Sequence, residues 1–326
     1  MELYMKIQDR PIIIDNRNIR EDVPEINEYF EKAKEETENI PKVNNIVVDE
    51  KYVENVNCSV CGADESKQLL VKRGFVYVVC EQCGHVYLKN RMREEILLDL
   101  YKNAEIDVID RKTHESPYHV EFWQKVHGKY IDMLMNSGIS NNNLIDVGSG
   151  DGRFLKYCKN NTDLTLHAND YCSDNYEYIV DLVGKDSYYY EKTLNDIDFG
   201  SKKFGIITLW GVLEHLPNPV DILKKCHEIM DDDSKLLILI PNIYSRAFKI
   251  LGVNVPTLNP RQHINFYTKE SMQYLCNETG FVLTGDYQEL PVIDLMYPYI
   301  DYSEKLIEEI VDADKPYNKV YILTKA

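Results

Sequence analysis

Long apolar runs are missing from this 326-residue chain. No window reaches the ~18 apolar residues that a membrane-spanning helix needs, and the N-terminal MELYMKIQDRPIIID lacks the apolar centre of a secretory signal. Positive charge is also scarce, since 37 Lys and Arg stand against 54 Asp and Glu, giving a net charge of −17. This balance argues against broad nucleic-acid binding but allows a local basic site. We therefore expect a cytoplasmic protein without a membrane span.

The chain has eight cysteines but not the short, secreted character of a disulfide scaffold. Four of them form two Cys-x-x-Cys pairs with 18 residues between the pairs, and glycine follows each pair directly. Four thiolates at this spacing predict a closed tetrahedral site for a structural Zn²⁺; a metal-free redox pair is the alternative. The predicted ligands are Cys58, Cys61, Cys80 and Cys83. The others are expected to be small core residues: Cys158, Cys172, Cys226 and Cys276.

A glycine-rich turn follows a short apolar run in Leu144–Leu155, which reads LIDVGSGDGRFL. This pattern predicts a strand, a tight turn and the start of a helix, where free N–H groups suit polar ligand groups. The spacing is G-x-G-x-G and differs from the G-x-G-x-x-G of dinucleotide-binding folds. Asp146 lies within the strand end. Both features favour S-adenosyl-L-methionine over NAD as the ligand.

Composition and motifs divide the chain into four predicted parts: an acidic leader (1–56), a zinc ribbon (57–90), a helical connector (91–142) and an α/β domain (143–326). The leader holds 14 Asp and Glu against 8 Lys and Arg. Within it, Pro11–Ile14 fits a strand, and residues 24–40 fit a helix that Pro41 ends. An oligomer contact, a lid and a solvated tail all stay open as its role.

Two shorter parts link the leader to the α/β domain. The ribbon has an alternating segment, Lys67–Val79, that fits a hairpin turning near Arg73 and Gly74. The connector fits two helices, 93–101 and 118–137.

Strand-like and helix-like segments alternate regularly from Leu144 onward, which predicts a doubly wound, seven-stranded, Rossmann-like α/β sheet. Asn218 is expected to cap a helix that Pro219 begins and that runs through Met230, and a second helix is expected to begin at Thr268 and end at Gly280. Ligands of such sheets bind at the carboxyl ends of the strands. The predicted strands are 144–147, 164–168, 187–190, 205–209, 235–240, 281–288 and 319–324.

Taken together, four motifs resemble a class I S-adenosylmethionine-dependent methyltransferase with an N-terminal zinc ribbon, of a subgroup associated with sugar, surface-glycan and natural-product methylation. The motifs are the paired cysteines with CEQCGHVY, Leu144–Leu155, Phe204–Pro219 (FGIITLWGVLEHLPNP) and His263–Gly280. The resemblance implies that residues 143–326 are the methyltransferase domain. It covers most of the chain beyond the leader. Gly205 departs from the Asp that the family usually has, which we interpret as a matter of strand packing.

The resemblance also implies roles for the residues around the turn. The methionine part of the cofactor would contact Asp146, Gly148, Ser149 and Gly150. Asp170, at the end of the second strand, would accept hydrogen bonds from the ribose hydroxyls, with a loop or cap carboxylate as the alternative. The remaining cofactor residues would be Thr193 and Leu194 beside the adenine, and Trp210 where the substrate edge meets the cofactor.

Three residues beyond the fourth and fifth strands are candidates for catalysis: Glu214, His215 and His263. His215 is the first choice as general base because the reference pKa of histidine is ~6.5; a purely structural, hydrogen-bonding role is the alternative for His215 and for His263. The long segment Ile243–Gln262 fits a lid or substrate loop. Its Arg246 and Arg261 could hold an anionic group or lie on the surface.

The leading hypothesis is methyl transfer to a hydroxyl of a small molecule, sugar or glycan, including a nucleotide sugar. A zinc-ribbon methyltransferase that modifies RNA or protein is the alternative, for which Lys89, Arg91 and Arg93 provide a short basic edge. The low content of positive charge counts against that alternative. An NAD dehydrogenase is disfavoured by the glycine spacing, and an inactive scaffold by the intact cofactor motif.

Overall fold

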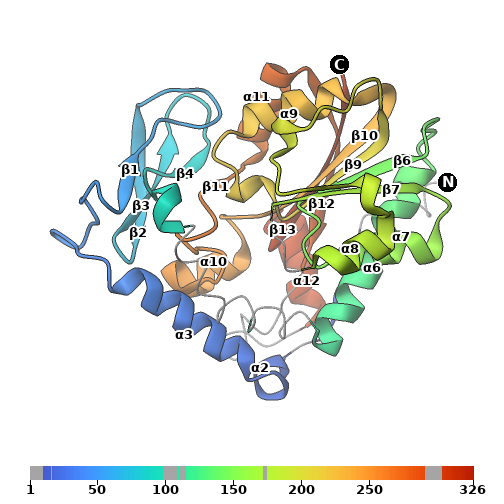
Figure 1. Ribbon diagram of the computed structural model, residues 1–326. Coiled ribbons are helices and arrows are strands. Elements are labelled where there is room, and N and C mark those ends of the chain that lie inside the picture. The colour runs from blue at the N-terminus through green and yellow to red at the C-terminus, as the bar shows by residue number, and fades with distance from the viewer. Residues whose placement is uncertain (1–9, 16, 98–108, 110–114, 172–174, 291–302) are drawn as a thin grey trace.

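The computed structural model describes residues 10–15, 17–97, 109, 115–171, 175–290 and 303–326. A seven-stranded sheet forms its centre, with strand order β12-β13-β10-β9-β6-β7-β8 (Figure 1). Strands β10, β9, β6, β7 and β8 run parallel to one another, and β13 is antiparallel to both β10 and β12. The strands are β6 (Asn143–Val147), β7 (Thr165–Asp170), β8 (Tyr188–Tyr190), β9 (Phe204–Trp210), β10 (Met230–Pro241), β12 (Phe281–Glu289) and β13 (Asn318–Lys325). All seven predicted strands are present, and the predicted doubly wound α/β sheet is confirmed.

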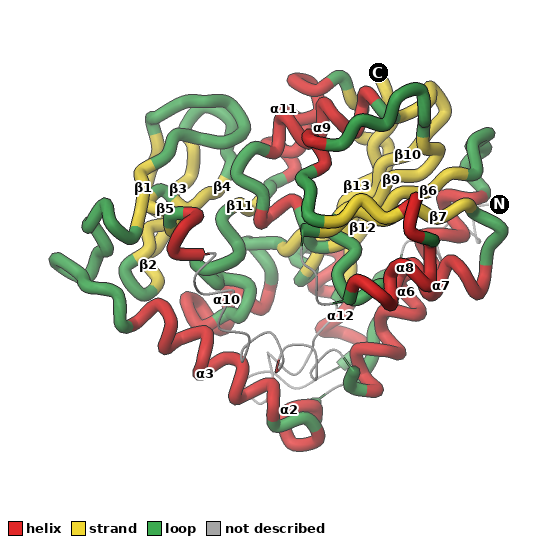
Figure 2. Tube along the Cα trace, in the orientation of Figure 1, coloured by secondary structure: helices red, strands yellow, loops and turns green. Residues whose placement is uncertain are grey.

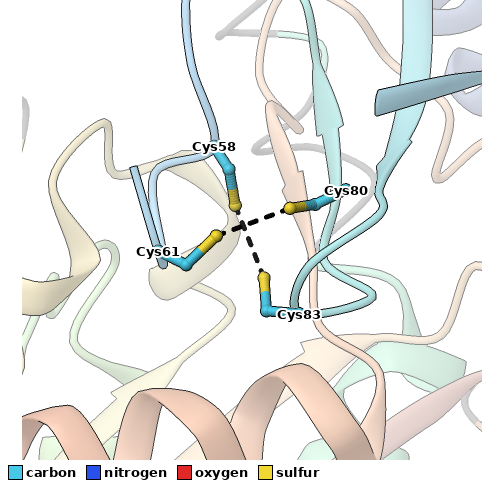
Figure 3. Close-up of side chains that lie close together, drawn as sticks. All are labelled: Cys58, Cys61, Cys80 and Cys83. Atoms are coloured by element: carbon cyan, nitrogen blue, oxygen red, sulfur yellow. Dashed lines mark hydrogen bonds between the residues drawn. The ribbon is translucent and has the colours of Figure 1, made fainter. Parts of the chain in front are cut away.

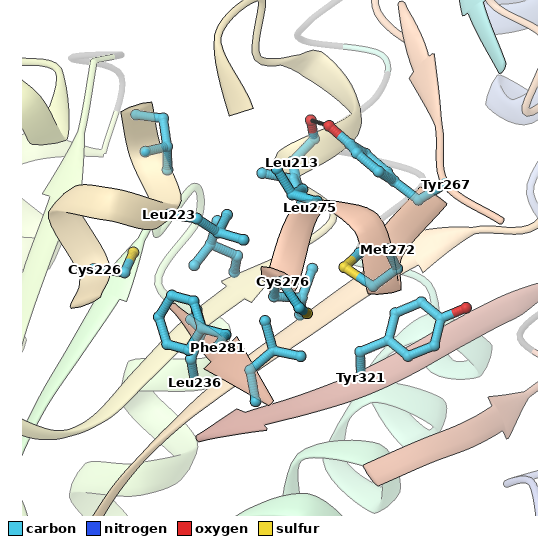
Figure 4. Packing of buried hydrophobic residues seen from close by; sticks show 14 of the residues in the cluster. Leu213, Leu223, Cys226, Leu236, Tyr267, Met272, Leu275, Cys276, Phe281 and Tyr321 are labelled. Carbon is cyan, nitrogen blue, oxygen red and sulfur yellow. Dashed lines mark hydrogen bonds between the residues drawn. The ribbon is translucent and has the colours of Figure 1, made fainter. Parts of the chain in front are cut away.

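Helices cover both faces of this sheet (Figures 1 and 2). Side chains of β6 alternate between the two faces, so Leu144 packs in the core under one helical layer while Ile145 and Val147 pack in the core under the other. The first layer consists of α6 (Pro117–Met135), α7 (Arg153–Asn161) and α8 (Tyr176–Val183). The second consists of α9 (Pro219–Glu228) and α11 (Lys269–Thr279), whose packing is shown in Figure 4.

A smaller four-stranded sheet, of order β11-β4-β3-β2, lies beside the large one (Figure 1). Arg73 and Gly74 both have positive φ, 53° and 92°, and join β2 to β3, so the predicted hairpin is confirmed. Its edge strand β11 comes from the C-terminal half of the chain and pairs with β4. The strands are β2 (Ser66–Lys72), β3 (Phe75–Cys80), β4 (Val86–Leu88) and β11 (Asn265–Phe266). A separate two-stranded ladder pairs β1 (Val53–Asn55) with β5 (Asn90–Met92).

The remaining helices surround the two sheets. The leader contains α2 (Ile19–Asp22) and α3 (Glu25–Glu38), the second of which matches the predicted helix. The segment Ile243–Gln262 contains α10 (Arg246–Leu251), and α12 (Glu304–Asp312) precedes β13. None of the helices in these described segments is both long and apolar enough to cross a bilayer. Short 3₁₀ turns are η1 (Lys185–Ser187), η2 (Leu194–Asp196), η3 (Leu213–His215) and η4 (Gly252–Asn254).

Three local predictions were wrong. Pro11–Ile14 is not a strand, because the N–H of Ile12 donates to the buried Glu289 carboxylate at 2.6 Å instead of joining a ladder. The Asn218 side chain makes no capping bond, although the helix does begin at Pro219. That helix ends at Glu228 rather than running through Met230, where β10 begins.

Three other predictions concern helix α11, the connector and the cysteines. Thr268 caps α11 and Gly280, at φ 78°, ends it, as predicted. Of the predicted helix 93–101 the structure describes residues 93–97, of which 94–97 are helical, and the remainder lies outside the described residues. Cys158, Cys226 and Cys276 are buried as expected, and Cys172 lies outside the described residues.

The close approach of another backbone segment accounts for Gly205 on β9, where the family usually has Asp. A Cβ atom added there would lie 1.9 Å from the backbone oxygen of Asn141, so the position has no room for any side chain. We expect Gly205→Ala to lower the free energy of unfolding by about 3 kcal/mol, the upper part of the usual range for overpacking a core. Urea denaturation of the variant checks this, with Gly200→Ala as the comparison, where an added Cβ meets nothing and the positive φ of 57° alone costs about 1 kcal/mol. Equal midpoints for the two variants would contradict it.

Candidate active site

The glycine turn forms a tight loop between β6 and α7. Gly148, Gly150 and Gly152 all have positive φ, between 54° and 73°, which L-residues with side chains rarely adopt. The turn is fixed to β7, because the N–H groups of Gly148 and Ser149 donate to the backbone carbonyl of Asn169 at 2.8 and 3.1 Å. The Oγ of Ser149 is buried and has no hydrogen-bond partner among the described residues. An unpaired buried hydroxyl in such a turn fits a ligand with polar groups.

Asp146 lies beneath this turn, in the middle of the sheet. Its side chain is 2% exposed, and its Oδ1 accepts a hydrogen bond of 2.7 Å from the Thr208 hydroxyl on β9. Burial raises the pKa of Asp146 to about 8. A cationic ligand group near this carboxyl would favour its charged form.

Asp170 lies at the carboxyl end of β7, where the resemblance places the ribose. Its Oδ2 accepts a hydrogen bond of 2.6 Å from the N–H of Gly150, so the strand end and the glycine turn are directly connected. Asn175 completes the connection by donating to the Gly150 oxygen at 3.2 Å.

The two residues expected beside the adenine have different surroundings. Thr193 is exposed and donates to Asp196 at 2.5 Å, whereas Leu194 is buried in the core under α9. The loop before them is held by Asn169, whose amide donates to the oxygens of Tyr189 and Lys192. Sequence reasoning missed Asn169, although a polar residue inside an otherwise buried strand was a signal for it.

Trp210 ends β9 and lies against an aromatic group on α6 and α7. Its ring centroid is 5.1 Å from that of His127 and 5.2 Å from that of Phe154. The indole N–H is buried and has no partner among the residues described. The structure therefore places Trp210 in the packing between β9 and the first helical layer.

Glu214, His215 and His263 lie together, as one ligand atom from each is within 4.8 Å of the others. The rings of His215 and His263 meet edge to face at 4.9 Å between centroids. Burial lowers the pKa of His215 to about 4 and that of His263 to about 3, and raises that of Glu214 to about 8. The neutral form of each group is thereby favoured.

This cluster borders the glycine turn. Val212, directly before η3, packs so closely on Gly148 that a Cβ atom there would lie 2.6 Å from the valine Cγ2. The N–H of Ile264 donates to the backbone carbonyl of Glu214. The Tyr267 hydroxyl donates to the backbone carbonyl of Leu213 at 3.2 Å (Figure 4). The segment around β11 thus holds η3 beside the turn.

The two arginines of the Ile243–Gln262 segment are both paired with carboxylates. Arg246 lies 3.0 Å from Glu309, and the fully buried Arg261 lies 3.3 Å from Glu36 on α3. The leader therefore contacts the segment that directly precedes His263.

The four paired cysteines converge at one point of the ribbon (Figure 3). The Sγ atoms of Cys58 and Cys83 are 3.6 Å apart, and those of Cys61 and Cys80 are 3.4 Å apart. These distances exceed the ~2.05 Å of a disulfide and are close to the ~3.8 Å between thiolates around tetrahedral zinc. The donor set therefore fits Zn²⁺.

His85 lies outside this cysteine cluster and connects the ribbon to the segment around η3 and β11. Its Nε2 lies 2.9 Å from Oδ1 of Asn265, to which Ser59 also donates at 2.8 Å. The Asn265 amide in turn donates to the oxygen of Leu216, next to η3. The ribbon thus supports the loop that carries His215.

A family model described as a methyltransferase domain matches residues 121–284, just over half of the chain. The chain belongs to this family. Its seven-stranded sheet is the class I S-adenosylmethionine-dependent methyltransferase fold, as the resemblance implied.

Relatives of this methyltransferase are distant. A ubiquinone biosynthesis O-methyltransferase from Glaesserella parasuis serovar 5 (strain SH0165) is 37% identical over 51 residues, which are 16% of this chain and 22% of that protein. The match thus spans about a fifth of the curated relative.

Solved structures resemble the methyltransferase in fold. The N,N-8-amino-8-demethyl-D-riboflavin dimethyltransferase of Streptomyces davawensis is 14% identical, with a TM-score of 0.46 over 71% of this chain and 62% of that one. The 1,6-didemethyltoxoflavin-N1-methyltransferase of Burkholderia thailandensis is 11% identical, with a TM-score of 0.47 over 80% and 99%. At these identities the substrates of those enzymes do not identify the acceptor of this one.

Proposed function

We propose that this protein transfers a methyl group from S-adenosylmethionine to a hydroxyl of a small molecule, sugar or glycan. The observation that carries the proposal is the packing of Val212 on Gly148, because it brings the glycine turn and the Glu214–His215–His263 cluster to the same edge of the sheet. A cofactor site and two neutral histidine rings that can accept a proton are then adjacent, an arrangement suited to methyl transfer to a hydroxyl oxygen.

In this proposal the turn and Asp170 hold the cofactor. Bound S-adenosylmethionine supplies a methyl carbon on a sulfonium, which makes the carbon open to in-line attack. Asp170 accepts hydrogen bonds from the two ribose hydroxyls of the cofactor, while Asp146 provides negative charge near the positively charged part of the cofactor. The exposed Thr193 borders the rest of the site, and Leu194 and Trp210 support it from the core packing described above.

His215 has the geometry of a proton acceptor. Its Nδ1 lies 3.0 Å from the oxygen of Gln262, and because a carbonyl only accepts, Nδ1 carries the hydrogen. The neutral ring therefore has a lone pair on Nε2, which faces Glu214 Oε1 at 4.0 Å. In the proposed reaction Nε2 takes the proton of the acceptor hydroxyl, the oxygen bonds to the methyl carbon, and the carbon–sulfur bond breaks to leave S-adenosylhomocysteine.

The basic edge of the ribbon gives little support to an RNA substrate. Lys89, Arg91 and Arg93 each lie within 4 Å of a carboxylate, at 2.5 Å from Asp64, 2.7 Å from Glu54 and 3.6 Å from Glu95 respectively. Their charges are already compensated, which leaves a small acceptor as the better proposal.

A transfer assay with a labelled methyl donor tests this function. We expect label to enter at least one member of a panel of nucleotide sugars, free sugars and small-molecule cell extracts, and no label to enter RNA or protein fractions. Label in RNA or protein alone would overturn the small-molecule acceptor.

We also propose that the four ribbon cysteines bind one structural Zn²⁺. Because their thiolates are the ligands, a thiol-specific mercurial should release about one zinc per chain, read with a colorimetric zinc indicator. Blocking the thiols without any release of zinc would show that the cysteines are not metal ligands.

A further inference from the structure

The Glu214–His215–His263 cluster has the composition of a metal site distinct from the four cysteines. Its three donor residues come from η3 and from the segment directly before β11. Two histidines and one glutamate are a donor set of catalytic zinc sites, which have three protein ligands and one open position. The four-cysteine site, by contrast, is closed.

Hydrogen bonds orient both histidines as metal-binding histidines are oriented. The Nδ1 of His215 donates to the Gln262 oxygen at 3.0 Å, and the Nδ1 of His263 donates to the Thr257 oxygen at 2.7 Å. When neutral, both rings therefore have their lone pair on Nε2. A backbone carbonyl holding the far ring nitrogen is the usual support of a histidine that binds a metal.

The glutamate is an independent indication of a ligand. Glu214 is only 3% exposed, and its Oε2 is buried without a hydrogen-bond partner among the described residues. Leaving a buried polar atom unpaired costs about 1–3 kcal/mol, and more when the group is charged. A cation at this point would remove that cost.

We propose that Glu214, His215 and His263 bind one divalent metal ion, Zn²⁺ or an ion of similar preference, with an open position for the oxygen of the acceptor. Donors bound to one tetrahedral zinc at ~2.0–2.2 Å lie ~3.3–3.6 Å apart. The Nε2 of His215 and the Oε1 of Glu214 are 4.0 Å apart, and all three donors lie within 4.8 Å of one another, so side-chain adjustments of about an ångström bring them to one ion. This inference rests on the proposed methyl transfer, since it names how that same site activates the acceptor.

With the ion bound, the chemistry at the acceptor changes in one respect. The lone pairs of both histidines are then used by the metal, so His215 does not take the proton. A hydroxyl on the open position is more acidic and loses its proton to water, after which its oxygen bonds to the methyl carbon as the carbon–sulfur bond breaks. Glu214 loses its proton to water when it binds the ion and then carries a negative charge as a ligand.

Metal content of the full chain tests the inference. After incubation with ZnSO₄ and desalting, the wild-type protein should hold about two zinc ions per chain, whereas Glu214→Gln and His263→Gln should each hold about one. His227→Gln, which changes a histidine on α9 outside the cluster, should hold as many as the wild type. The zinc kept by the cysteines reports that each variant is folded. Equal content in the wild type and both cluster variants would overturn the proposal.

Two further measurements make the result specific. Cobalt substitution should show thiolate charge-transfer absorption from the cysteine site plus a second ion without it, and only the second should vanish in Glu214→Gln. S-adenosylmethionine binding is measured by calorimetry on the same samples. Cofactor binding without a second metal ion overturns the metal site alone, whereas no cofactor binding overturns the proposed function itself.

Discussion

Replacing Asp170 by alanine should weaken S-adenosylmethionine binding by about a hundredfold. The carboxylate would lose two charge-assisted hydrogen bonds to the ribose, each worth ~1.5 kcal/mol or more, and ~3 kcal/mol corresponds to that factor. The variant also loses the bond of 2.6 Å from the Gly150 N–H, which fixes the glycine turn. Isothermal titration calorimetry with the cofactor measures the effect.

Two comparisons show whether the loss is specific to Asp170. Asp163→Ala removes a carboxylate that precedes β7 and should leave the affinity unchanged. Asp170→Asn keeps one acceptor oxygen for Gly150 and should give an intermediate affinity. If Asp170→Ala binds the cofactor as tightly as the wild type, the ribose contact lies elsewhere.

Replacing His215 by alanine should lower kcat by about a hundredfold to a thousandfold, because proton removal from a hydroxyl by a positioned group contributes on this scale. Cofactor affinity should change by less than about twofold, since the ring is held by the oxygen of Gln262 and not by the glycine turn. The same direction is expected if the ring holds a metal ion. Steady-state kinetics and calorimetry on one preparation separate the two quantities.

The control for His215 is His227→Ala on α9, which removes an imidazole outside the cluster and should keep full turnover. A wild-type kcat for His215→Ala would leave His263 as the proton acceptor or show that the acceptor needs no base. A parallel loss of kcat and cofactor affinity would assign His215 a supporting role in the fold.

The seven strands of the large sheet could be predicted because each is a short apolar or alternating run between two helical patterns. In the small sheet the hairpin of β2 and β3 could be predicted as well, but β4 and β11 could not. β11 has only two residues, Asn265 and Phe266, and it is a strand solely because β4, far away in the sequence, pairs with it. No local pattern encodes such a pairing.

The site shows the same division. The glycine turn follows from spacing, since a strand end and a turn are local, and the family resemblance pointed to Asp170 at the next strand end. Thr208, which donates to Asp146, was missed because their contact depends on the register between β6 and β9. Likewise, each histidine of the cluster was predicted separately. Their ring centroids lie 4.9 Å apart because the N–H of Ile264 donates a hydrogen bond to the backbone carbonyl of Glu214, a contact between distant parts of the sequence.

The leader illustrates the limit of local reasoning. Pro11–Ile14 has the composition of a strand, but the buried Glu289 carboxylate accepts a hydrogen bond from the N–H of Ile12. The same carboxylate accepts a second hydrogen bond, of 2.7 Å, from Lys129. A carboxylate from β12 thus decides the conformation of a segment some 280 residues earlier in the chain.

Calorimetric titration of the wild-type protein with S-adenosylmethionine and, separately, with NAD tests the central claim most directly. The account predicts binding of about one S-adenosylmethionine per chain at the glycine turn, lost in Asp170→Ala, and no binding of NAD. Binding of NAD with no binding of S-adenosylmethionine would contradict it.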